Sequence, residues 1–281
     1  MKRLIVSTST SCLNYLDKPD NVKMLPMNVH IRNQDYLDGQ DLTIEQLSTF
    51  ILANPDVQPT TSAPSQQQLI NFFENLVNEG VEEVLVICVS ETLSLTAANI
   101  RQVRDMFIDR LSIHIFNSRS VSHGEAILVY KAAQMFKENA LISEIVAHLN
   151  QIRDKTSMYI TVDNLKAMVR TKRLSAPAGF LANLFNIKPI VVVDIKGQVS
   201  AHEKVRSFER SLVRLAELID GHARNRKGQL YIMANTINPY LNELKQILER
   251  MGYHQVPIMP VASVSVANIG VYAIGVLFVE H

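Results

Sequence analysis

The sequence lacks most features that mark a protein class, and these absences narrow its function before any motif is considered. Among 281 residues only Cys12 and Cys88 are cysteines, too few for a disulfide framework, so we expect a reducing, cytoplasmic setting. Lys and Arg number 28 against 27 Asp and Glu, and this net charge of +1 supplies no basic face for nucleic acid. We therefore expect no nucleic-acid partner.

Long hydrophobic runs are also missing. A membrane helix needs about 20 consecutive apolar residues. The most apolar stretch, Val256 to Val279, is interrupted by Pro257, Pro260, Asn268, Gly270 and Gly275. Near the start of the chain, Leu4-Ile5-Val6 leads directly into serines and threonines, which is too short for a signal-peptide core. We expect neither stable membrane insertion nor a secretion signal.

Short motifs of catalysis and metal binding are absent as well. The chain contains no G-x-G-x-x-G, C-x-x-C, H-E-x-x-H or G-x-S-x-G. Gly270 and Gly275 have the spacing of a P-loop, but Val276-Leu277 follow where Lys and Ser or Thr are required. The eight histidines are scattered along the chain. We expect no catalytic residue, no metal and no cofactor.

What is present is a large hydrophobic fraction, 47% of all residues, in a chain long enough for about two domains. Through residues 1–155 short β-rich runs alternate with helical patterns, and Val84 to Ile87 form an apolar run typical of a buried parallel strand. Asp41 is predicted to cap one helix, residues 60–64 to form a turn, and Ser65 to Gln68 a capping box. This alternation predicts a doubly wound α/β domain with a parallel sheet.

The second half, residues 156–281, has a different pattern. Two strand-like runs, Ile190 to Val193 and Gln198 to Ser200, flank Lys196-Gly197, which predicts a hairpin. A helix from Arg206 to Ile219 and a strand from Gln229 to Met233 follow. We predict an α+β domain with a largely antiparallel sheet, and a boundary near Thr156.

Hydroxyl side chains gather where predicted strands give way to helices. Thr61-Ser62 precede one helix, and Ser94 and Thr96 lie where another begins after a core strand. In an α/β domain such loops meet at the crevice where ligands bind, and a helix N-terminus suits a carboxylate or phosphate. The alternative is simple helix capping, for which Ser and Thr are preferred anyway. Because no neighbouring residue marks a base for Ser94, binding is favoured over covalent catalysis.

Several of these segments, taken in order, resemble one family. They are residues 60–65 (Thr-Thr-Ser-Ala-Pro-Ser), residues 90–96 (Ser-Glu-Thr-Leu-Ser-Leu-Thr) and Ile187-Lys188-Pro189-Ile190. Further matches are Asn117-Ser118 with Ser122 and Gly124, Asp163-Asn164-Leu165, Arg173-Leu174-Ser175, and the basic residues Lys204 and Arg206. Over nearly the whole chain, the sequence resembles the DegV family of bacterial fatty-acid-binding proteins.

The resemblance implies the DegV-like pair of domains and a long-chain fatty acid as ligand, with its carboxylate in the interdomain cleft and its tail in an apolar tunnel. Some members present that carboxylate to a separate fatty-acid kinase. By resemblance, Thr61, Ser62, Ser94 and Asn268 would bind the carboxylate. Thr96, Arg173 and Arg206 would support the site or face a partner. Hydroxyl and amide groups can donate the hydrogen bonds that a carboxylate accepts.

The chain also departs from the family's pattern. Asn268 stands where the family has a histidine, and Leu95 and Tyr272 are bulky where glycine is usual. These residues would narrow or fill the tunnel. The alternative is therefore a divergent member with altered or no lipid binding that acts as an interaction or regulatory protein. A third hypothesis is an enzyme that uses Ser94, which requires a base within hydrogen-bond reach. Ligand chain length, saturation and oligomeric state are not specified by the sequence.

Overall fold

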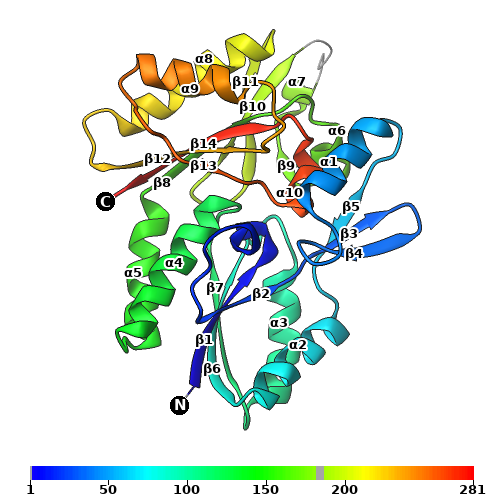
Figure 1. The fold of residues 1–281 in the computed structure, drawn as a ribbon, viewed down its shortest axis with the longest axis vertical. Helices are drawn as coiled ribbons and strands as arrows, with labels where there is room; N and C mark the ends of the chain where they lie inside the picture. The colour runs from blue at the N-terminus through cyan, green and yellow to red at the C-terminus, as the bar shows by residue number, and fades with distance from the viewer. Residues whose placement is uncertain (1, 182–186) are drawn as a thin grey trace.

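Two sheets of different type organise the chain (Figure 1). The computed structural model describes residues 2–181 and 187–281. The N-terminal elements are β1 (Lys2–Thr8), β2 (Val22–Leu25), β3 (Asn28–Ile31), β4 (Gln34–Leu37), α1 (Ile44–Ala53), β5 (Thr60–Ser62), α2 (Gln66–Asn78), β6 (Val81–Cys88), α3 (Thr96–Arg104), β7 (Ser112–Asn117), α4 (His123–Lys137) and α5 (Ile142–Asp154). The C-terminal elements are β8 (Thr156–Thr161), α6 (Lys166–Arg170), β9 (Leu174–Ser175), α7 (Ala178–Leu181), β10 (Lys188–Val193), β11 (Val199–Val205), α8 (Phe208–Ala223), β12 (Gly228–Ala234), α9 (Leu241–Arg250), β13 (Ile258–Met259), α10 (Ser263–Ile269) and β14 (Ile274–Glu280).

The first sheet is parallel throughout, with strand order β2-β1-β6-β7. Side chains alternate across a strand, so Leu4 and Val6 of β1 pack toward α2 and α3, whereas Ile5 packs toward α4 and α5. Figure 1 shows the two helix pairs on opposite sides of this sheet. The predicted doubly wound α/β arrangement is confirmed.

A small antiparallel sheet, β4-β3-β5, was not predicted and corrects two local interpretations. The segment expected to be a turn begins with strand β5, because Thr61 pairs with Val29 of β3. The cap of α1 is Thr43 and not Asp41. The Thr43 hydroxyl accepts from the Gln46 N–H, and the Gln46 side chain accepts from the Thr43 N–H in return.

The second sheet has seven strands in the order β13-β12-β14-β8-β10-β11-β9. All pairs are antiparallel except the two outermost, β12 with β13 and β11 with β9, which confirms the largely antiparallel prediction. Helices α8 and α9 pack on one face of this sheet. All seven strands follow residue 155 and all strands of the other sheets precede it, although the exact domain boundary remains a prediction.

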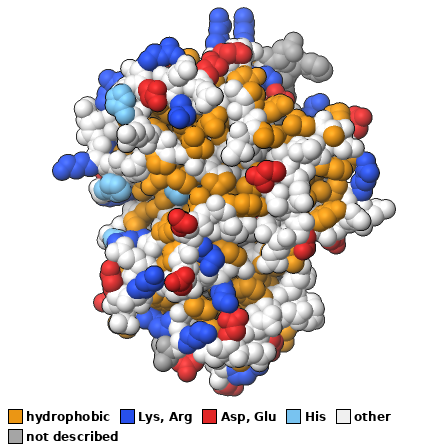
Figure 2. Space-filling model, in the orientation of Figure 1, with side chains coloured by type: hydrophobic (Ala, Val, Ile, Leu, Met, Phe, Trp, Pro, Cys, Tyr) orange, Lys and Arg blue, Asp and Glu red, His pale blue; other side chains and the backbone are white. Residues whose placement is uncertain are grey.

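The other face of the seven-stranded sheet shares a hydrophobic core with the N-terminal part. This core joins Met27, Val29 and Leu47 to Met158, Ile160 and many further residues of the C-terminal part. On the face shown in Figure 2, hydrophobic side chains are most extensive across the middle of the molecule. Among the described residues, no helix has both the length and the apolar composition needed to cross a membrane.

A buried carboxyl group lies at the carboxyl end of β1. Glu125, in the first turn of α4, has no exposed surface. Its Oε1 accepts from the Thr8 hydroxyl at 2.6 Å and from the Thr8 N–H at 3.2 Å, and its Oε2 accepts from the Thr10 hydroxyl. Burial raises the pKa of Glu125 from 4.5 to about 8, because these neutral donors replace only part of the lost hydration.

This pKa makes the stability of the protein depend on pH in a specific direction. Between pH 4.5 and 8 the folded state holds the Glu125 proton more tightly than the unfolded state, so this group's contribution to stability falls as pH rises. Replacing Glu125 by Gln removes that dependence. We expect Glu125→Gln and the wild type to melt at similar temperatures near about pH 5, and the variant to melt higher near about pH 9. A difference in melting temperature between the two proteins that stays constant with pH would contradict the raised pKa of Glu125.

Candidate functional site

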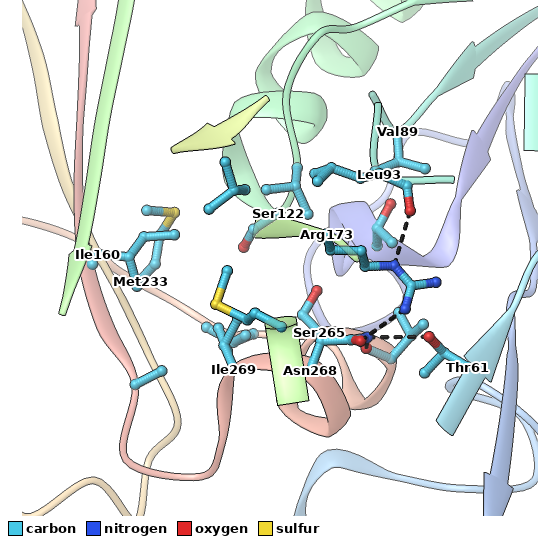
Figure 3. Close-up of a pocket in the computed structure, with 18 of the residues that line it drawn as sticks. Thr61, Val89, Leu93, Ser122, Ile160, Arg173, Met233, Ser265, Asn268 and Ile269 are labelled. Atoms are coloured by element: carbon cyan, nitrogen blue, oxygen red, sulfur yellow. Dashed lines mark hydrogen bonds between the residues drawn. The ribbon is translucent and has the colours of Figure 1, made fainter. Parts of the chain in front are cut away.

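A pocket lies between the two sheets (Figure 3). Its wall combines residues of the N-terminal part, such as Thr61, Val89 and Ser94, with residues of the C-terminal part, such as Met158 and Asn268. Neither part alone could enclose this space.

One end of the pocket is polar, and three side chains from distant segments meet there. The Asn268 amide, on α10, donates from Nδ2 to the Thr61 hydroxyl of β5 at 3.1 Å. Its Oδ1 accepts from Nη1 of Arg173 at 2.9 Å. Figure 3 shows these three residues together at one side of the pocket. Because Thr61 Oγ1 accepts from Asn268, its own hydroxyl proton is free to point toward a ligand.

Arg173 is a half-buried cation in this polar end. Besides Asn268, it donates from Nε to the Leu93 carbonyl at 3.0 Å. Both acceptors are neutral, and no acidic side chain in the described parts of the chain forms an ion pair with it. Burial lowers the pKa of Arg173 from its ordinary value of 12.5, but an arginine stays charged at neutral pH. A partly desolvated cation of this kind suits an anionic ligand.

Ser94 lines the pocket, whereas Thr96 contacts Ser94 but does not line the pocket. The Ser94 hydroxyl lies 2.8 Å from the Thr96 hydroxyl and accepts from the Thr96 N–H at 3.3 Å. The Thr96 hydroxyl also lies within donating distance of the Met27 sulfur, at 3.3 Å. Whenever Thr96 donates to Ser94 instead, the Ser94 proton is left for a ligand. No histidine or carboxylate among the described residues is hydrogen-bonded to Ser94, so the base that the enzyme hypothesis requires is not found there.

Ser62 and Arg206 are not brought to the pocket. Neighbouring residues of a strand point to opposite faces, so Ser62 turns away from Thr61. Its hydroxyl lies 2.9 Å from Nε2 of His30, whose Nδ1 lies 2.6 Å from Asp35. The hydrogen-bonded series Ser62–His30–Asp35 has the connectivity of a hydrolase triad. However, the Asp35 side chain is 80% exposed, and neither Ser62 nor His30 lines the pocket. Arg206, at the end of β11, is exposed and also lies outside the lining.

Most of the remaining wall is apolar and more deeply buried. Met158 and Met233 are 2% and 3% exposed, and with Met27 and Met168 they bring four methionines to the lining. Gly275 completes this wall on β14. A Cβ atom at Gly275 would come within 2.9 Å of the Met233 side chain and 3.1 Å of Ile160, so a larger residue would crowd the pocket.

The bulky departures from the family pattern do not fill this space. Leu95 is 68% exposed and does not line the pocket. Tyr272 is half-buried and does not line the pocket either. The sequence suggested that both would narrow the tunnel, and in the structure neither does.

Helix α10 carries Ser265, Asn268 and Ile269 into the pocket wall, and residues of the N-terminal part hold it there. Oδ1 of buried Asp38 accepts from the Val264 N–H at 3.3 Å. Burial raises the pKa of Asp38 from 3.8 to about 6, so the acceptor is mostly ionised at neutral pH. Sequence reasoning missed this helix because Val256 to Val279 reads as one apolar segment.

Thr10, Ser122 and Ser265 also line the pocket and were assigned no role from the sequence. Ser122 was noticed only as a landmark of the resemblance. The spacing of Val264, Ala267 and Asn268, three and four residues apart, was the signal that could have revealed α10. Within the described residues, no three His, Cys, Asp or Glu side chains group as a metal site requires.

The pocket between the two parts is largely apolar, and it is polar and cationic at one end. Its chemistry suits a molecule with an apolar chain and an acidic head group. A profile described as "Uncharacterised protein, DegV family" matches residues 2–281, and the chain belongs to this family. A DegV domain-containing protein of Staphylococcus aureus strain COL is 29% identical over 286 aligned residues, 99% of each chain.

Solved structures of the family share the fold. A structure described as a fatty acid binding DegV family protein, from Streptococcus agalactiae, has a TM-score of 0.88 at 24% identity and covers 100% of this chain and 99% of its own. A DegV family protein from Ruminococcus gnavus, described with vaccenic acid, has a TM-score of 0.82 at 22% identity over 99% of both chains. The identities are low, so this similarity concerns the fold.

The Asn268 contacts predict a measurable contribution to stability. Asn268→Ala would remove one hydrogen-bond partner from Arg173 and one from Thr61 at a half-buried position, so we expect a loss of about 1–3 kcal/mol in the free energy of unfolding. Urea denaturation followed by circular dichroism measures this. Asn71→Ala is the control, because Asn71 is exposed on α2 and its amide oxygen accepts from the exposed Gln67. Equal stability of the two variants would contradict the structural role of Asn268.

Proposed function

We propose that this protein binds a long-chain fatty acid, or a similar acyl carboxylate, as a non-enzymatic carrier. The observation that supports this most directly is the asymmetry of the pocket. Arg173, which forms no ion pair among the described residues, lies with several hydroxyls at one end, and a mostly apolar, more deeply buried wall forms the rest. The relatives described as fatty acid binding support the same ligand class.

In this proposal the carboxylate lies beside Arg173 and accepts hydrogen bonds from Thr61 and Ser94. Asn268 orients Arg173 and Thr61, and Thr96 orients Ser94. An amide at position 268 cannot carry a proton or charge, so the positive charge of the site comes from Arg173. Charge-assisted hydrogen bonds of this kind are roughly twice as strong as neutral ones.

The ligand's two ends would meet different surroundings. Thr61, Ser94, Arg173 and Asn268 are partly exposed, whereas Met158 and Met233 at the apolar wall are almost fully buried. The carboxylate would therefore be the end nearest the solvent. This arrangement fits a cytoplasmic carrier that presents the carboxylate to a separate fatty-acid kinase.

The rival hypothesis is a divergent member that has lost lipid binding and acts as an interaction or regulatory protein. It was motivated by Leu95, Tyr272 and Asn268. Because Leu95 and Tyr272 leave the pocket open and Asn268 still bonds Arg173 and Thr61, its structural motivation is weakened.

Extraction of the purified protein tests the proposal. Protein produced in bacteria, extracted with organic solvent and analysed by mass spectrometry, is expected to release fatty acids in near-stoichiometric amount. Denatured and washed protein serves as the control for surface-bound lipid. A preparation that contains no fatty acid and takes up none in a subsequent binding titration would contradict the proposal and favour the rival hypothesis.

A further inference from the structure

A buried hydroxyl group without a partner lies part-way along the apolar wall. Ser122 is 5% exposed, and its hydroxyl forms no hydrogen bond of acceptable geometry within the described residues, although the Cys12 thiol is close by. Figure 3 shows its oxygen directed into the pocket. A buried hydroxyl that loses its water partners without replacement costs stability, so its presence in this wall calls for a chemical reason.

The position of Ser122 in the fold does not supply that reason. It occupies the N-cap position of α4, where a serine commonly bonds a free backbone N–H of the first turn, yet its side chain caps none. The hydroxyl instead faces away from the helix and toward the cavity. The Cys12 thiol, a weak hydrogen-bonding group, lies near this hydroxyl, and the pocket lining includes the apolar side chains of Val121, Met158 and Ile160.

A second hydroxyl faces the same region from the opposite wall. Ser265, on α10, lines the pocket, and its side chain has no hydrogen bond among residues 2–181 and 187–281. In Figure 3 the oxygens of Ser122 and Ser265 both point into the space between their two walls. They are separate from the Arg173–Asn268–Thr61 group at the polar end.

We propose that Ser122, with Ser265 opposite it, recognises a hydroxyl group carried part-way along the acyl chain, so that the ligand class is hydroxylated long-chain fatty acids. A hydroxyl both donates and accepts, and can therefore satisfy Ser122 in either sense. An unsubstituted methylene at this position leaves the serine without a partner. This inference rests on the proposed function and adds the substrate class.

The test compares stearic acid with a set of hydroxystearic acids that differ only in the carbon that carries the hydroxyl. Dissociation constants are measured by calorimetry on delipidated wild-type protein, Ser122→Ala, and Ser143→Ala as an exposed helical control. We expect one positional isomer to bind the wild type roughly 3- to 10-fold more tightly than stearic acid. In Ser122→Ala the ratio should fall to about one, and in Ser143→Ala it should keep its wild-type value.

The outcomes separate this inference from the function on which it rests. If stearic acid and every isomer bind the wild type equally, or if the preference persists in Ser122→Ala, recognition by Ser122 is wrong while fatty-acid binding stands. If no fatty acid of either kind binds, both proposals fail. Thermal melting of the unliganded variant checks folding, and an unchanged or higher melting temperature is expected because an unsatisfied buried group has been removed.

Discussion

The attachment of α10 to the N-terminal part is the contact on which the rest of the site depends. This helix lies between two strands of the seven-stranded sheet in the chain, but its N-terminus is bonded to Asp38 and its Asn268 to Thr61 of the small sheet. Its side chains also join the core that both parts share. The contacts of α10 that join the two parts of the molecule are therefore also the contacts that form the polar end of the pocket.

The position of Asn268 on α10 explains how neutral groups can hold the charged Arg173 side chain in this site. The Asn268 amide accepts from Arg173 and donates to Thr61 at the same time, so one side chain orients the cation and a hydroxyl together. An aspartate at this position would neutralise Arg173 and remove its attraction for an anion. The amide fixes the geometry and leaves the charge for a ligand.

Much of the fold was predictable because local patterns and tertiary packing agree. The apolar run of β6, the capping box at Ser65 and the hairpin around Gly197 each have a signal in neighbouring residues. Strand β5 and helix α10 were missed because their residues are stabilised by partners distant in sequence. Strand β5 is only three residues long and depends on β3 for its hydrogen bonds.

The candidate site was predictable to a smaller extent. Thr61, Ser94 and Arg173 stand in recognisable segments, and the structure brings them to one pocket. Ser62 could not be separated from Thr61 by sequence, since only the strand pairing decides which of two adjacent residues faces the cavity. Ser122 could not be recognised because a serine before a helix ordinarily caps it, and here it does not.

The most direct measurement compares a fatty acid with its methyl ester, which keeps the tail and removes the charge. Affinities of palmitic acid and methyl palmitate are measured for the wild type and for Arg173→Met. If Arg173 recognises the carboxylate, the wild type binds the acid roughly 10- to 100-fold more tightly than the ester, and the variant loses most of that preference. Equal affinity of the wild type for both molecules would contradict the account.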